Sequence, residues 1–395
     1  MFNRLLGDLD DAKILYDQPS QRWVACAIDL ADGSLGSQNV ILAVSKDSTP
    51  VPLAGNWTKY LVAIARPGSK TDSSTLAVDA NGIYISAYYF HGGDVNDGHE
   101  VVAIKKPDIY QGTYVATFLY VTNTELNTLS ITPVVNFDTS RLGSNVWFVA
   151  KGPSTGQGTN YKGGPLQYRR LSWNTNSTAQ WLDTSWLVLP EPQPTYLDYF
   201  DLDGPIIYAP QLTGAGMSLQ RTGSRLRTPI IRNSVLWVCQ HIGLDGTDGD
   251  YGGNETGSTV DRSAIQWLKL QLNSAGTPLT HLAHGRIYDT AATYPYYYYM
   301  PSLVVSANGD MVTGFSGSRS TEYVGAFYFG RLADGTTSGS PMLVQAGTGA
   351  SPIAPYWGDY SYTCLDPDGS IWTVQEYAFA PSGVYWGTWI TQINR

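Results

Sequence analysis

Charged side chains are scarce in this sequence, and cationic side chains are the scarcer kind. Only 14% of the 395 residues are charged, and 24 Lys and Arg stand against 33 Asp and Glu, which gives a formal net charge of −9. Proteins bind phosphate backbones through clustered cations, and the sequence contains no such cluster. We therefore expect no nucleic-acid partner.

Long apolar runs are also missing, although 43% of the residues are hydrophobic. A helix that crosses a membrane needs roughly 18 or more consecutive apolar residues, so no membrane span is expected. The opening stretch, MFNRLLGDLDD, has one basic residue and no apolar core of signal-peptide length. We expect no export signal in the chain as given.

Cysteine is sparse as well. Cys26, Cys239 and Cys364 lie in apolar, strand-like runs and show no CxxC spacing, so they are interpreted as small buried residues rather than as disulfide partners or metal ligands. The sequence also lacks a phosphate-binding glycine loop, a GxSxG elbow, an HExxH motif and a Rossmann fingerprint. Nucleotide chemistry is therefore not expected.

Aromatic and turn-forming residues are abundant instead, with 27 Tyr, 12 Trp and 41 Gly. This composition favours strands and turns over helices. Short apolar or alternating runs recur along the chain between Gly, Asn, Asp and Pro, whereas helical periodicity is almost absent. The sequence predicts a nearly all-β protein. Its composition is typical of proteins found outside the cell or on a cell or virion surface, which is the expected location.

A hairpin with a tight Asp, Asn or Gly turn recurs six times. Its second strand opens with a large apolar residue at Trp23, Tyr84, Trp147, Trp237, Met311 and Trp372. A third strand follows each hairpin, and a fourth follows in five copies. Repeated four-stranded antiparallel units predict a β-propeller with six blades, seven being the alternative, folded as a single domain over residues 1–395.

The repeat predicts how the ring closes and which tryptophans are buried. The sixth copy ends at its third strand, so residues 1–8 are expected to add its outer strand and remove an open sheet edge. The four tryptophans of the repeat, Trp23, Trp147, Trp237 and Trp372, are expected in the core because their position recurs.

Several stretches resemble a known group of proteins. YDQPSQRW, GRIYD, MPSLVVSANGDMVTGFSGS and WGDYSYTCLDPDGSIWTVQEYA are similar to segments of uncharacterised secreted bacterial β-propeller proteins. The turns VDANG, SANGD and DPDGS also resemble a degraded form of the Asp-box turn of sialidase-like propellers, although the complete Ser-x-Asp-x-Gly-x-Thr-Trp string does not occur. The resemblance implies the propeller fold.

Asp359 and Glu376 are the candidate catalytic carboxylates. They fall on neighbouring strands of one predicted hairpin, and a glycosidase needs two carboxylates ~5–10 Å apart around the bond that it cleaves. Arg225 is the cation expected beside them. The alternative interpretation is structural: the Asp accepts backbone N–H bonds at a strand start, and the Glu pairs with an arginine such as Arg225.

Loops on one rim of the predicted propeller supply candidate ligand-binding residues. Aromatic faces stack on sugar rings, and polar side chains supply hydrogen bonds; for the aromatic residues the alternative role is packing between blades. The candidates are Asp72, His91, His241, Tyr297, Tyr299, Trp357 and Trp386.

A metal site is the remaining candidate. Asp245, Asp248 and Asp250 lie in an oxygen-rich loop that could hold a structural Ca²⁺, although the spacing is not that of an EF-hand; a plain turn-rich loop with no cofactor is the alternative. His91, with Asp94, Asp97 and His99, forms a second and weaker metal pattern.

These features predict an extracellular carbohydrate-recognising propeller with a carbohydrate ligand, acting as a glycoside hydrolase or polysaccharide lyase if it is an enzyme. The competing interpretation is a non-enzymatic structural or adhesive protein of a cell or virion surface. The oligomeric state is left open.

Overall fold

The computed structural model describes most of the chain, and structural statements refer to these residues only. They are residues 9–29, 39–64, 66–91, 95–126, 128, 130–138, 145–154, 162–189, 199–202, 207–214, 216–219, 223–246, 260–273, 279–350, 357–379 and 386–394. Contacts group the chain into two compact units, which are described separately. Unit 1 comprises Met1–Gly152 and Leu166–Val188, and unit 2 comprises Pro153–Pro165 and Leu189–Arg395.

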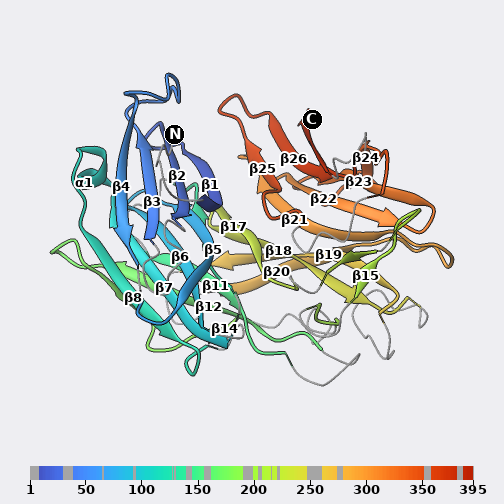
Figure 1. The fold of residues 1–395 in the computed structure, drawn as a ribbon, viewed down its shortest axis with the longest axis horizontal. Coiled ribbons are helices and arrows are strands. Elements are labelled where there is room, and N and C mark those ends of the chain that lie inside the picture. Colours follow the sequence, from blue (N-terminus) through green and yellow to red (C-terminus); the bar gives the residue numbers. More distant parts are fainter. Residues whose placement is uncertain are drawn as a thin grey trace. The chain divides into compact units, whose positions relative to one another are not determined.

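Unit 1 contains three antiparallel sheets, called blades 1 to 3 (Figure 1). Blade 1 is β1 (Leu9–Asp17), β2 (Arg22–Asp29), β3 (Asn39–Ser45) and β4 (Trp57–Ala63); blade 2 is β5 (Lys70–Val78), β6 (Gly82–His91), β7 (Val95–Lys105) and β8 (Ala116–Thr122). Blade 3 is β9 (Ile131–Pro133), β11 (Val146–Lys151), β12 (Leu166–Trp173) and β13 (Ala179–Trp181), with β14 (Leu187–Val188) also paired to β12. The short helix α1 (Lys106–Tyr110) precedes β8, and β10 (Val135–Asn136) follows β9.

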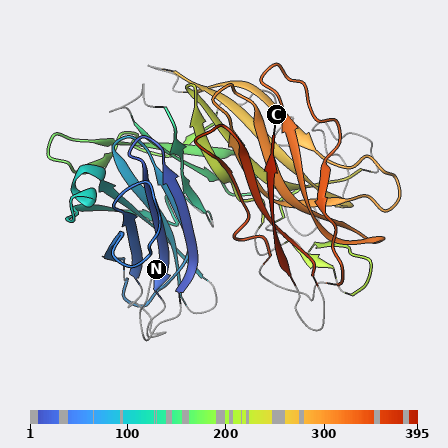
Figure 2. The same ribbon diagram turned by 90° about the horizontal axis from the view of Figure 1, so that it is seen from above.

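Unit 2 contains blades 4 to 6, whose strands run from yellow to red along the chain (Figure 2). Blade 4 is β17 (Arg227–Arg232), β18 (Val235–Leu244), β19 (Arg262–Leu272) and β20 (Leu279–Ile287); blade 5 is β21 (Tyr297–Val305), β22 (Met311–Arg319), β23 (Glu322–Arg331) and β24 (Met342–Gln345). Blade 6 is β25 (Tyr362–Leu365), β26 (Ile371–Tyr377) and β27 (Gly387–Ile393). A two-stranded pair, β15 (Tyr208–Ala209) and β16 (Met217–Ser218), precedes blade 4.

The predicted hairpin turns form as the sequence indicates. In the VDANG turn between β5 and β6, one carboxylate oxygen of Asp79 accepts hydrogen bonds from the backbone N–H groups of Asn81 (2.7 Å) and Gly82 (2.8 Å). Short Asp and Asn side chains stabilise turns in this way because they replace backbone acceptors. The turns therefore set where each second strand begins.

A β-bulge recurs in the first strand of four blades. The pairing register shifts in β1, β5, β17 and β21, and one residue in each shift has a positive φ: Asp11 (49°), Ser73 (53°), Thr228 (40°) and Met300 (55°). None of these residues is glycine, so each bulge holds a backbone conformation that L-residues seldom adopt. A bulge re-aims the side chains around it, which makes these four places the natural positions for a site.

The predicted fold class is confirmed: the protein is an all-β propeller with six blades. The single-domain interpretation stays a prediction, and so does closure of the last blade, because residues 1–8 lie outside the described residues. Within the described chain, no helix is long and apolar enough to cross a membrane.

The core prediction is confirmed for two of the four repeat tryptophans. Trp147 and Trp237 are buried. Trp23 and Trp372 are only half-buried, which corrects the expectation for them. Their indole N–H groups donate to polar atoms at the turn ends of their sheets, Ser48 O (2.9 Å) and Ser370 Oγ (3.2 Å). A partner in a turn holds each ring at the end of its sheet, where solvent reaches it.

This difference predicts unequal effects of truncation. Trp237→Ala should lower the free energy of unfolding by roughly 3–5 kcal/mol, because it removes a fully enclosed ring. Trp372→Ala should cost about half as much. Urea denaturation of both variants measures the two values, and equal losses would contradict the division between enclosed and half-buried rings.

Candidate functional site

Residues from three blades of unit 2 converge on Met300, at the bulge of β21. Met300 is buried, and its backbone N–H donates to Nδ1 of His241 on β18 at 3.0 Å. On its other side, a guanidinium nitrogen of Arg227 lies 3.5 Å from the Met300 sulfur. The bulge therefore fixes one residue against blade 4 through both its backbone and its side chain.

Gly358, in the segment before β25, completes the packing around Met300. A Cβ atom added to Gly358 would lie 2.4 Å from Met300 Cγ, and the φ of Gly358 is +71°. Both the space and the backbone conformation therefore require glycine at this position. The WGDY segment of blade 6 consequently passes directly against the bulge of blade 5.

The same glycine holds the predicted catalytic acid. The Gly358 N–H donates to Oε2 of Glu376 on β26 at 3.0 Å. Ser316 supports Glu376 from β22, since its hydroxyl donates to the Glu376 carbonyl oxygen and accepts the Trp357 indole N–H, both at 3.0 Å. Hydrogen bonds to both the backbone and the side chain fix the orientation of Glu376.

Burial and nearby charges shift the pKa of the groups around Glu376. Burial raises the pKa of Glu376; the Gly358 N–H opposes this shift, and the charge of Asp359 adds to it. Burial also lowers the pKa of Arg227, while the attraction of Asp359 raises it and the repulsion of Arg225 lowers it. Asp359 thus lies within electrostatic reach of both Glu376 and Arg227. We call Arg225, Arg227, Met300, Asp359 and Glu376 the Met300 cluster.

The three candidate catalytic residues predicted from sequence interact through their charges in this region: Asp359 acts on Glu376 and on Arg227, and Arg225 acts on Arg227. Their roles remain predictions. The contact seen at the Glu376 carboxylate is the backbone of Gly358, rather than the arginine that the structural alternative expected. Sequence reasoning missed Arg227, which begins β17 two residues after Arg225 in SRLRTP.

Three of the predicted ligand-binding residues are buried: Tyr299, Trp357 and His241. The Tyr299 hydroxyl lies 3.1 Å from that of Ser318, and His241 and Trp357 make the hydrogen bonds described above. These contacts lie within the protein, and the ligand-binding role of the three residues stays a prediction.

The other predicted ligand-binding residues have exposed surface. Asp72, His91 and Trp386 are exposed, and Tyr297 is half-buried. Burial and the charge of Asp261 raise the pKa of Tyr297 to about 12, while Arg262 opposes the shift. Tyr297 thus combines partial exposure with neighbouring charges, as does Tyr296, which lies beside Glu322 and Arg319.

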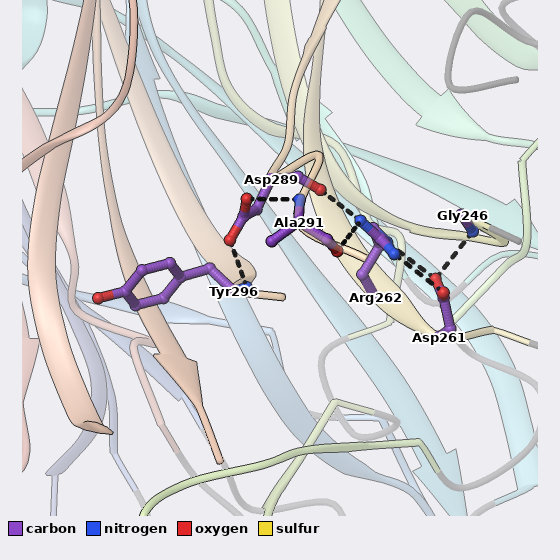
Figure 3. Close-up of polar contacts among 6 residues, drawn as sticks. All are labelled: Gly246, Asp261, Arg262, Asp289, Ala291 and Tyr296. Atoms are coloured by element: carbon purple, nitrogen blue, oxygen red, sulfur yellow. Dashed lines mark hydrogen bonds and ion pairs between the residues drawn. The ribbon is translucent and has the colours of Figure 1, made fainter. Parts of the chain in front are cut away.

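Arg262 organises the loop that precedes Tyr297. It pairs with Asp261 (2.9 Å) and donates to the carbonyl oxygens of Asp289 and Ala291, as Figure 3 shows. The carboxylate of Asp289 in turn accepts the N–H groups of Ala291 (3.0 Å) and Tyr296 (2.9 Å). This buried arginine fixes the backbone from which β21 begins, with Tyr297, Tyr298 and Tyr299 as its first residues.

Unit 1 contains a carboxyl pair that sequence reasoning missed. Asp11 at the bulge of β1 shares a side-chain hydrogen bond with Asp72 at the bulge of β5. Burial raises the pKa of Asp11 to about 7, Lys13 opposes the shift, and Asp72 adds to it. Two carboxyl groups that share one proton cannot both ionise readily. No sequence pattern indicates this pair, because it depends on two bulges coming side by side.

The raised pKa of Asp11 predicts how stability depends on pH. The folded protein binds this proton more tightly than the unfolded chain, so its stabilising contribution is present at low pH and is lost as pH rises from about 4 to about 7. In the Asp11→Asn variant the free energy of unfolding should fall by roughly 1–2 kcal/mol less over this pH range than in the parent, allowing for partial exposure of the carboxyl group. Asp72→Asn should move the decline to lower pH.

Chemical denaturation at several pH values measures both effects. The Asp72 variant separates the neighbouring charge from burial, because it keeps Asp11 and its surroundings. An Asp11→Asn protein whose stability falls between pH 4 and 7 as steeply as that of the parent would contradict the shared proton.

The predicted calcium site stays a prediction, because only one of its three residues lies within the described structure. Asp245 is buried, whereas Asp248 and Asp250 lie outside the described residues. Nδ1 of the exposed His91 lies 2.5 Å from Oδ1 of Asp97. Nε2 of the buried His99 lies 3.1 Å from the carbonyl oxygen of Thr128. Across the part of the chain that the structure describes, no three His, Cys, Asp or Glu side chains come together to hold a metal ion.

Neither a protein-family model nor a curated protein sequence matches the chain. Similar solved structures include a sialidase from Trypanosoma rangeli, at 11% identity and a TM-score of 0.43, over 98% of this chain and 54% of that one. The chain thus spans about half the length of this sialidase. An endo-arabinanase from Bacillus licheniformis (10% identity, TM-score 0.34, 83% and 96% covered) and an α-L-arabinofuranosidase from Lactobacillus brevis (12%, 0.40, 86% and 96%) are also similar. All three are carbohydrate-active enzymes.

The contact between Gly358 and Met300 can be tested directly. Gly358→Ala should lower the free energy of unfolding by roughly 2–4 kcal/mol, because the methyl group both strains a left-handed backbone and overlaps Met300. Gly369→Ala is the matched control, since Gly369 also has a positive φ (+90°) but nothing lies near its added methyl group. It should cost only about 1 kcal/mol. Equal losses in thermal or urea unfolding would show that the overlap is unimportant.

Proposed function

We propose that this propeller recognises carbohydrate outside the cell or at a cell or virion surface and hydrolyses glycosidic bonds at the Met300 cluster. The observation that carries the proposal is Glu376, a carboxyl group that burial and the neighbouring Asp359 keep protonated to higher pH. A glycosidase requires a protonated carboxylic acid and an ionised carboxylate at one site. In this proposal Glu376, whose pKa is raised, is the acid and Asp359 is the carboxylate.

The reaction follows from this arrangement. Glu376 gives its proton to the glycosidic oxygen as the bond from that oxygen to the anomeric carbon breaks, and the bonding electrons leave with the oxygen. Asp359 either takes a proton from an attacking water or attacks the anomeric carbon itself. In the second case water later cleaves the sugar–Asp359 ester and Glu376 recovers its proton. The separation of the two carboxyl groups when substrate is bound decides between the two routes.

The arginines supply the electrostatic setting. The cation of Arg227 interacts with the charge of Asp359, which brings a positive charge near the carboxylate that acts as base or nucleophile in this proposal. Arg225 brings a second positive charge to the start of β17. Guanidinium groups donate several hydrogen bonds in a fixed plane, which suits them to hold sugar hydroxyl or carboxylate oxygens. Tyr297 offers a half-exposed ring for stacking against a sugar.

Glu376→Gln tests the proposal. The amide keeps the shape of the side chain but has no proton to transfer, so hydrolysis should fall roughly a thousandfold, while the melting temperature and sugar binding stay nearly unchanged. Reducing-end release from a panel of glycosides that includes sialosides and arabinans measures turnover. A glycan array on the purified full chain measures binding.

The control is Glu322→Gln, another carboxylate of unit 2, which pairs with Arg319 away from the Met300 cluster. It should retain full turnover. Loss of stability in the Glu376 variant without any change in turnover would contradict the catalytic role. An ultraviolet-absorbing unsaturated product would indicate a polysaccharide lyase instead. Sugar binding without turnover would support recognition but not catalysis. The absence of both binding and turnover would favour a structural or adhesive protein.

A further inference from the structure

Two of the five histidines lie together on the outer strand of blade 4, away from the Met300 cluster. His281 and His284 are three residues apart on β20. In a regular strand, residues three apart point to opposite faces. Here the register shifts between Lys269 and Leu270 of the neighbouring strand.

The shift puts the two histidines on one face. His281 pairs with Leu270 and His284 pairs with Leu268, and these two leucines are two residues apart on β19. Directly paired residues of an antiparallel sheet share a face. The extra residue, Leu282, is taken up by the bulge and is exposed. The bulge thus creates a pair of imidazoles that the sequence spacing alone would separate.

The ring geometry suits a shared ion. Nδ1 of His284 lies 3.2 Å from Nε2 of His281, and the ring centroids are 5.2 Å apart. Imidazole nitrogens bind Zn²⁺ at about 2.0–2.1 Å, so two of them on one ion stand about 2.9–3.4 Å apart at angles from square to tetrahedral. The observed nitrogen–nitrogen separation falls within this range; to bind an ion, the hydrogen bond between the rings breaks and each ring turns its nitrogen toward the ion.

We propose that His281 and His284 together bind a divalent transition-metal ion, with imidazole as the ligand on both sides. Copper(II) should bind more tightly than zinc, in keeping with the general affinity order for nitrogen ligands. The inference is independent of the proposed function, because neither histidine belongs to the Met300 cluster.

The surroundings prepare both rings as ligands. Burial lowers the pKa of His281, as does the charge of His284, while a hydrogen bond to the backbone of Ala283 opposes the shift. Burial and the cation of Arg286 lower the pKa of His284. Both shifts favour the neutral imidazole, which is the form that binds metal. A backbone contact on a ligating histidine also holds its ring in orientation.

The rest of the coordination shell sets a modest affinity. Among the described residues, no third His, Cys, Asp or Glu joins the pair, so water completes the shell. Arg286 is the nearest cation, and it opposes a second positive charge, although its Nε donates to Gln266 at 3.1 Å. The site is thus an open, two-histidine site.

The experiment titrates the full chain, prepared without a polyhistidine tag, with CuCl₂ and separately with ZnCl₂. Calorimetry gives the stoichiometry and affinity, and electron paramagnetic resonance of the Cu²⁺ form reports nitrogen couplings. One ion per chain is expected, with couplings from two nitrogens. Each single variant, His281→Ala or His284→Ala, should weaken binding at least tenfold. Leu282→Ala, at the exposed residue of the same bulge, is the control and should bind as the parent does.

Two results would contradict the proposed site. Undiminished binding in the His284 variant, or no binding by the parent at millimolar metal, would overturn the proposal and leave a histidine–histidine hydrogen bond. Circular dichroism checks that the variants fold. His284→Gln keeps a polar side chain at the site should the alanine variant unfold, and it must lose the ion as well.

Discussion

The constraint on which the site depends is the bulge in the first strand of the blades. A regular strand alternates its side chains between two faces, and four of these strands break that alternation at a residue with positive φ. Such a conformation costs roughly 1–2 kcal/mol for a residue other than glycine. The bulges change the direction of nearby side chains and bring residues of neighbouring blades together. Asp11 lies beside Asp72 in unit 1, and Met300 contacts Arg227 and His241 in unit 2.

Neighbouring bulges are held by hydrogen bonds to one another, which explains how the strained backbone persists. In unit 1 the Ser74 hydroxyl donates to the carbonyl of Asp11 at 3.0 Å. In unit 2 the Leu303 N–H, just after the bulge of β21, donates to the hydroxyl of Thr228 at 2.7 Å. Each bond satisfies a backbone group that the broken ladder leaves unpaired. The bulge of one blade therefore stabilises the bulge of the next, within each unit.

The sequence predicts what depends on local chemistry and misses what depends on the bulges. Turn residues such as Asp79 and the recurring large residues identify the hairpins, their number and the fold class, because each signal lies within one hairpin. The bulges have no such signal, so Asp11 and Arg227 were missed. The burial of Tyr299 is likewise not visible in the sequence, because a residue at a strand entry can point to either face. Asp359 and Glu376 could be paired from the sequence because they flank one short hairpin, and their charges do interact.

The few charges of this protein fall into two kinds, and the difference explains why the bulges are the functional candidates. Asp17 is fully buried, yet Lys106 (2.6 Å) and the Tyr110 hydroxyl (2.6 Å) both bind it, so its charge is balanced. At the bulges, by contrast, Asp11 faces Asp72, and Glu376 faces Asp359. Like charges held together in partial burial destabilise a fold unless protons are shared between them. A chain with so few charged residues has little structural need for such pairs, which is the physical reason to look for chemistry there.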